Sequence, residues 1–172
     1  MSETPAPEVR VAIPADFEAV AALLAELGRP AILGGPEEAA HRRRFANYLA
    51  RTDAIALVAE RDDRVVGFCD LEFRQRLNFL DEQAWIPDLI VSEDERSRGA
   101  GAALLARAEQ LARERGCWGM GLESATWRER AHAFYERVGW TKGGYAFGRQ
   151  LGGRPWPPPP PEQGSVAPTA NV

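Results

Sequence analysis

The chain of 172 residues has no long apolar run, few cysteines and histidines, and a single lysine. Its longest apolar stretches, such as residues 19–25, reach about a third of the ~20 residues that a membrane-spanning helix needs. The first ten residues contain no apolar segment of the secretory-signal kind. Two cysteines and two histidines at scattered spacings match no zinc-binding pattern. We therefore expect a cytoplasmic protein with no metal and no membrane partner.

The balance of charge is also informative. Lys and Arg total 21 and Asp and Glu total 25, which gives a net charge of −4. A net acidic chain is a poor candidate for sequence-independent binding to nucleic acid, because such binding needs many phosphate contacts. Cys69 and Cys117 both lie in apolar segments, so we expect buried, reduced thiols, with a disulfide or a reactive thiol as the alternative.

The length suits one domain, and the prolines mark where it ends. Seven of the 13 prolines fall within residues 152–172, and five of them are consecutive at 157–161. Consecutive prolines adopt an extended polyproline conformation. We therefore expect a flexible leader over residues 1–8, one domain over 9–151 and a disordered tail over 152–172. A binding site for a proline-recognising domain is the alternative reading of the tail.

Hydrophobic periodicity predicts alternating strands and helices. Helices are expected over residues 17–27, 37–50, 99–115 and 128–138, and strands over 9–12, 54–60, 65–74, 84–91 and 118–124. A final hairpin is expected to start at residues 139–140, with residues 145–151 as its second arm. A strand, a helix and a strand between residues 84 and 124 call for a right-handed crossover and a parallel pair, whereas the hairpins call for antiparallel pairs. The expected fold is a mixed α/β sheet with helices on both faces. Pro87 lies inside one strand and requires an edge, a bulge or a splay there.

The segment between this strand and the next helix has the features of an anion site. Gly99 and Gly101 leave backbone N–H groups uncovered at the positive end of a helix, and Arg96 and Arg98 add positive charge. A Walker P-loop is excluded, and a dinucleotide fingerprint would need glycine where Leu104 stands. A glycine-rich helix start with solvated arginines is the simpler alternative.

Two motifs together identify a family resemblance. The spacing of Arg96, Gly99 and Gly101 after a strand resembles the Q/R-x-x-G-x-G/A signature of the GCN5-related N-acetyltransferases, and RAHAFYERVGW at residues 130–140 resembles a second segment of that family. The resemblance covers residues 9–151. It implies the GNAT fold, a mostly antiparallel sheet with a splayed central parallel pair. It also implies transfer of acetyl from acetyl-CoA to a primary amine of a small molecule or peptide, by direct attack in a ternary complex.

The resemblance also assigns the cofactor contacts. The pantetheine arm would pair with the backbone of the splayed strand, and the pyrophosphate would take the amides of the following loop. The strand residues are Leu89, Ile90 and Val91, and the loop residues are Arg96, Ser97, Arg98, Gly99, Ala100, Gly101 and Ala102. Arg128 stands where the family commonly has Asn, so it could reach the cofactor or face solvent.

The catalytic residues are also carried over from the family. Tyr135 matches a frequent general acid, and its phenol, with a pKa of about 10, can protonate a leaving thiolate whose thiol has a pKa of about 8.5. In several relatives a Glu that acts as the general base stands where this chain has Pro87. Asp88 is adjacent, but alternation points it to the opposite face unless a bulge re-aims it. Glu72 and Glu123 are other candidates for the base.

These departures leave a second hypothesis open. A catalytically weak CoA-binding module, serving as a sensor or an assembly subunit, would also explain the loss of the family residues at Pro87 and Arg128. Neither cysteine lies at a matching nucleophile position, which favours direct attack over an acetyl-enzyme. A homodimer is expected from the family resemblance alone.

Overall fold

The computed structural model describes residues 6–153, which form two compact units, residues 6–122 and residues 123–153. Residues 1–5 of the predicted leader and 154–172 of the predicted tail lie outside this range. The first unit contains the sheet and three α-helices, and the second contains one α-helix.

The elements follow the predicted order closely. The strands are β1 (Glu8–Val11), β2 (Ala54–Arg61), β3 (Arg64–Arg74), β4 (Gln83–Ile86), β5 (Leu89–Val91) and β6 (Gly119–Leu122). The α-helices are α1 (Phe17–Glu26), α2 (Glu38–Leu49), α3 (Ala100–Glu114) and α4 (Glu129–Arg137). Two short 3₁₀ helices, η1 (Pro14–Asp16) and η2 (Glu93–Glu95), precede α1 and α3.

The sheet is mixed, as predicted. Its strand order is β1-β2-β3-β4-β6, with β5 paired to β3 beside this path. The pairs β1–β2, β2–β3, β3–β4 and β3–β5 are antiparallel, whereas β4 and β6, joined through α3, run parallel. The predicted single strand over 84–91 is therefore two strands, interrupted at Pro87 and Asp88.

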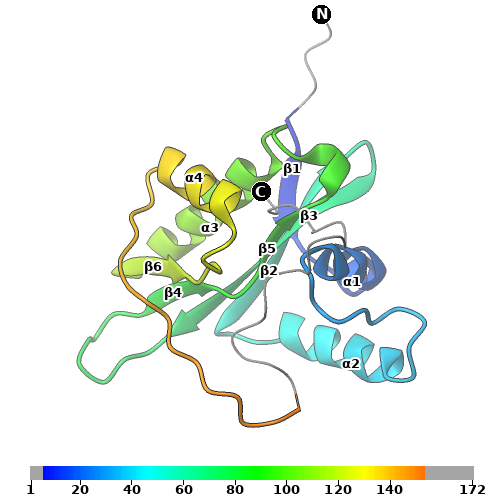
Figure 1. Ribbon diagram of the computed structural model, residues 1–172, viewed down its shortest axis with the longest axis horizontal. Helices are drawn as coiled ribbons and strands as arrows, with labels where there is room; N and C mark the ends of the chain where they lie inside the picture. The colour runs from blue at the N-terminus through cyan, green and yellow to red at the C-terminus, as the bar shows by residue number, and fades with distance from the viewer. Residues whose placement is uncertain (1–5, 154–172) are drawn as a thin grey trace, which may run out of the picture. The chain divides into compact units, whose positions relative to one another are not determined.

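Helices cover both faces of the sheet in the first unit (Figure 1). On one face, Val20 and Leu23 of α1 join Val58 and Phe68 of β2 and β3 in a buried cluster. On the other face, α3 packs so closely that a Cβ on Gly67 would lie 3.0 Å from a side-chain carbon of α3. The apolar spacing of each helix is thus explained by the face that it buries.

The predicted final hairpin is wrong. Residues 140–151 form neither helix nor strand, and the side chains of Tyr145, Phe147 and Leu151 are exposed. Aromatic residues favour a strand. That preference is a local signal, however, and a strand also needs a partner for its backbone, which no strand among the described residues provides.

Candidate functional site

The first unit contains the splay that the sequence predicted. β4 pairs with β3 on one side and with β6 on the other, whereas β5 pairs with β3 alone among the strands of the described chain. The break comes at Pro87, which has no N–H to donate to a neighbouring strand. Beyond it, the edge of β5 that faces away from β3 is open.

The open edge presents backbone groups of two residues. Asp70 N–H donates to the Asp88 carbonyl at 3.2 Å and Ser92 N–H to the Val66 carbonyl at 2.9 Å, so residues 88, 90 and 92 face β3. By alternation, the N–H and C=O groups of Leu89 and Val91 face away from β3. No hydrogen bond of these groups is found within residues 6–153. Of the three predicted contact residues, Ile90 differs, because its backbone groups face β3.

The loop that follows β5 ends in a helix start with free amides. Ser97 and Gly99 adopt positive φ angles of 62° and 92°, and Gly99 caps α3 in the left-handed conformation. The Gly99 carbonyl accepts the N–H of Ala103 at 3.0 Å. The amides of Gly99, Ala100, Gly101 and Ala102 therefore precede the first intrahelical bond, and no hydrogen bond of theirs is found within residues 6–153. Such a cluster at a helix N-terminus suits an anion.

The two arginines of this loop are held by carboxylates nearby. Arg96 Nη1 lies 3.4 Å from Glu93 Oε1, and the Arg96 side chain is largely buried. Arg98 Nη1 donates to Glu95 Oε1 at 2.8 Å. Both guanidinium groups therefore have a carboxylate partner, whereas the backbone amides of residues 99–102 have none in the described chain.

A buried ion pair fixes the loop to the β2–β3 hairpin. Arg61 and Glu95 hydrogen-bond to each other, and their side chains are only 4% and 6% exposed. Arg61 Nη2 also donates to the Arg98 carbonyl at 3.0 Å. Outside this pair, Arg64 bonds Asp94 at 2.7 Å in an exposed position. The hairpin therefore holds the loop backbone from two sides, which keeps its amides in place.

A bulge at Pro87 re-aims Asp88, and this is the condition for its predicted role as the base. Glu72 lies opposite Trp85 and Cys69 lies opposite Leu89, so β3 advances by three residues while the other strand advances by four. The extra residue turns Asp88 onto the face that carries Trp85. The Asp88 carboxylate accepts hydrogen bonds from Arg29 Nε at 2.9 Å and from Arg29 Nη2.

Asp70, which the sequence analysis did not consider, lies directly beside this bulge. Its Oδ1 accepts the Asp88 N–H at 2.7 Å. Burial and then the charge of Asp88 raise the pKa of Asp70 to about 8. In the sequence, an acid between the apolar residues Cys69 and Leu71 looks like a solvent-facing position of an alternating strand. The only local signal for another role is that it lies within the largely buried part of β3.

The other two candidate bases are occupied or exposed. Glu72 is bonded to Arg51 at 3.1 Å and to Arg74 at 3.3 Å. Glu123 belongs to the second unit and is exposed.

In the second unit, α4 carries the predicted acid. The Tyr135 ring is half-buried and meets Phe134 edge to face at 5.4 Å and Trp140 at 5.9 Å. Phe134 is buried, as expected of a core residue. Arg128, just before the helix, places its guanidinium 4.8 Å from the centre of the Trp127 ring. The roles of Tyr135 and Arg128 remain predictions.

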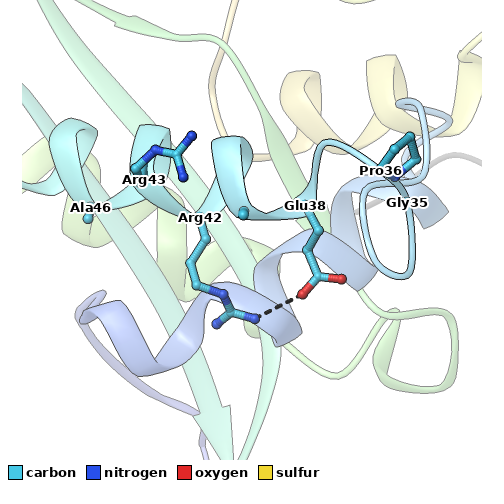
Figure 2. Close-up of a pocket in the computed structure, with 7 residues that line it drawn as sticks. Gly35, Pro36, Glu38, Arg42, Arg43 and Ala46 are labelled. Atoms are coloured by element: carbon cyan, nitrogen blue, oxygen red, sulfur yellow. Dashed lines mark hydrogen bonds and ion pairs between the residues drawn. The ribbon is translucent and has the colours of Figure 1, made fainter.

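A separate hollow lies along α2 and the turn before it (Figure 2). Arg42 bonds Glu38 there at 3.1 Å and also stacks over Phe17 at 4.4 Å. These polar groups already satisfy each other, so the splay is the better candidate site. Among the described residues no cluster of three or more metal-ligating side chains is present, and no helix there is long and apolar enough to cross a membrane.

Comparisons with known proteins agree with this geometry. The aminoalkylphosphonate N-acetyltransferase of Salmonella typhimurium is 31% identical over 86% of this chain and 93% of its own length. The structure of a Trypanosoma brucei acetyltransferase superposes with a TM-score of 0.72 at 24% identity, covering 84% of this chain and 99% of that one. A Bacillus halodurans transcriptional regulator, also 24% identical and with the same coverage, reaches 0.77. A sequence profile of the acetyltransferase (GNAT) family matches residues 20–140. The chain therefore belongs to the acetyltransferase (GNAT) family, and it is an N-acetyltransferase.

Proposed function

We propose that the protein transfers the acetyl group of acetyl-CoA to a primary amine, by direct attack of the amine in a ternary complex. The observation that carries this proposal is the continuous stretch from Leu89 to Ala102. It offers an open strand edge to an amide-bearing arm, and then a cluster of free helix N-terminal amides to a diphosphate. These two surfaces suit the amide-bearing arm and the diphosphate of a CoA molecule.

The state of the cysteines supports direct attack. Burial raises the pKa of Cys69 well above that of a free thiol, and burial also raises the pKa of Cys117. Both thiols are therefore neutral near pH 7 and poor nucleophiles. Neither forms a disulfide. Because unlinked cysteines fit a reducing compartment, we also propose that the enzyme acts in the cytoplasm.

Two proton transfers are required of the protein. The amine must lose a proton before its nitrogen can attack the thioester carbon, and the leaving sulfur must gain one. We assign the second transfer to the Tyr135 hydroxyl, as the family resemblance implies. The first belongs to the carboxylates at the break between β4 and β5, where Asp88 is the candidate that the sequence offered.

The test is an assay for free CoA thiol with a panel of amines. The panel contains an aminoalkylphosphonate, after the Salmonella relative, together with an aminoglycoside, a polyamine and a peptide with a free N-terminus. We expect at least one to release CoA. If none does, while acetyl-CoA still raises the melting temperature, the proposed transfer to a primary amine of these classes is refuted.

The variant Tyr135→Phe tests the assigned acid. We expect kcat to fall by about 10²-fold, the scale of a lost acid–base group, with unchanged affinity for acetyl-CoA. Tyr145→Phe is the matched control, because this tyrosine lies in the same unit and is 92% exposed. Equal turnover of both variants would show that Tyr135 is not the acid.

A further inference from the structure

Two aspartates face each other across the bulge at Pro87. The Asp70 carboxylate accepts the Asp88 N–H at 2.7 Å, and the Asp70 N–H donates to the Asp88 carbonyl at 3.2 Å. The two carboxylates differ in what else they contact. That of Asp88 is held by Arg29, with Nε at 2.9 Å, whereas no ion pair is found for that of Asp70 in the described part of the chain. Asp70 is partly exposed, so a ligand can reach it.

A tyrosine on α2 packs against the same face of the sheet, because Tyr48 adjoins the buried cluster that contains Ala56, and Ala56 lies opposite Asp70. The Tyr48 hydroxyl is buried and forms no hydrogen bond within residues 6–153. Asp70 exerts the largest effect of any charge on this hydroxyl, followed by Glu72. A buried hydroxyl is normally satisfied by a partner. An unsatisfied one beside a carboxylate without an ion pair indicates a place for a ligand that donates hydrogen bonds.

We propose that Asp70 takes the proton from the acceptor ammonium and that the Tyr48 hydroxyl binds the same group, with Asp88 and Arg29 as positioning residues. This rests on the proposed N-acetyltransfer. One N–H bond of the ammonium breaks and an O–H bond forms on Asp70. The electron pair that remains on nitrogen then attacks the thioester carbon, while the Tyr48 oxygen accepts a second N–H. The C–S bond breaks with its electron pair going to sulfur, which takes a proton from the Tyr135 hydroxyl. The nitrogen releases its surplus proton to solvent, which leaves the neutral amide, and solvent reprotonates Tyr135. The acceptor is therefore an amine that is protonated in solution at neutral pH.

The charges around Asp70 suit a base for such an amine. Asp88 and Glu72 oppose its ionisation, as does burial, and the Asp88 N–H favours it. The other segments packed nearby contribute Tyr48 from α2, Arg51 just after that helix, Arg29 after α1, and uncharged Ala56 opposite on β2. The resulting pKa of about 8 lies between those of an ordinary carboxylate and of an alkyl ammonium, about 3.9 and 10.4. A base with a pKa near the working pH is the efficient one.

The experiment measures kcat/KM from pH 6 to 10 at saturating acetyl-CoA, with one amine that the wild type accepts. Asp70→Asn should lower kcat/KM by about 10²-fold or more and remove the limb that titrates near pH 8. Asp88→Asn removes the opposing charge, so it should retain a limb displaced to lower pH by about 1 unit. Because the amine is the same throughout, its own ionisation cannot cause the difference. Asp53→Asn, an exposed aspartate bonded to Arg51, is the control and should behave as the wild type.

Two further measurements separate catalysis from folding. Tyr48→Phe should raise KM for the amine by about 10-fold with little change in kcat, since it removes one contact to a bound group. Asp70→Asn should also remove a pH dependence of stability. A carboxyl whose pKa rises from 3.8 to about 8 on folding lowers the free energy of unfolding as pH rises through that window. We therefore compare the free energy of unfolding of the variant with that of the wild type at two pH values. This difference should be more favourable to the variant at pH 9 than at pH 4.

The outcomes are distinct. If Asp70→Asn keeps wild-type kcat/KM, or if Asp88→Asn abolishes activity and Asp70→Asn leaves the limb in place, Asp70 is not the base, although the N-acetyltransferase stands. If none of the amines in the panel makes the wild type release CoA, the proposed function fails, and the role of Asp70 fails with it.

Discussion

The buried ion pair beneath the glycine-rich loop allows the sharpest test of how the loop is held. Replacing Glu95 by Gln keeps the side-chain volume but leaves the Arg61 guanidinium, 4% exposed, without a countercharge. Removing one partner of a buried pair costs about 3–5 kcal/mol, because the remaining charge stays out of water. For a protein of this size, 1 kcal/mol corresponds to roughly 2–4 °C, so the melting temperature should fall by about 6–20 °C.

The control lies one residue away. Asp94→Asn makes the same chemical change in a pair with Arg64 whose side chains are 59% and 55% exposed. An exposed pair contributes at most about 1 kcal/mol. Thermal unfolding followed by circular dichroism should therefore separate the two variants clearly. If Glu95→Gln lowers the melting temperature no more than Asp94→Asn does, the reasoning from burial is refuted.

A double variant distinguishes stability from ligand binding. Arg61→Met with Glu95→Leu removes both charges, and such replacements are often neutral or stabilising, so the melting temperature should recover. The Arg98 carbonyl, however, still loses the donor that Arg61 supplies at 3.0 Å. We therefore expect acetyl-CoA to bind about 10-fold more weakly to the double variant, by isothermal titration, despite its restored stability. Full recovery of both properties would show that Arg61 does not position the loop.

Two further predictions concern the sheet and its first strand. Gly121→Ala places a Cβ 2.7 Å from the Trp85 ring and should destabilise the protein by about 1–3 kcal/mol in urea unfolding, whereas Gly119→Ala, with open space, should cost less. Arg10 holds the pKa of Asp16 below its usual value through a hydrogen bond at 2.8 Å. The stability that this pair adds is present above the unfolded pKa of about 3.8 and lost as pH falls through the lower folded value. Asp16→Asn should therefore destabilise the protein at pH 7 in urea unfolding, and its difference from the wild type should shrink as the pH falls below 3.8.

Most elements could be predicted because their signals are local. The apolar spacing of α3 and the glycine before it located the helix to within one residue at each end. The aromatic residues of segment 145–151 also favour a strand, yet no strand forms there, since pairing depends on a partner elsewhere in the chain. Local patterns thus determine which segments can be regular, while the tertiary structure decides which of them are.

The candidate site was predicted where it depends on backbone, and missed where it depends on packing. Gly99 and the strand break at Pro87 are visible in the sequence because each restricts the backbone directly. Asp70 was missed, since its distinction from any other strand aspartate comes from Asp88 across the bulge and from the cover of α2. Neither neighbour is within ten residues of it in the chain.

The open edge of β5 has a consequence for how this protein can vary. Its donors and acceptors at Leu89 and Val91 are peptide groups, which every residue except proline supplies in full. Side chains there can be exchanged for others of similar volume while the groups offered to a ligand stay the same. An alanine scan is therefore blind to this surface. Replacing the amide of Val91 by an ester, through chemical synthesis of the chain, removes one donor and would reveal its contribution.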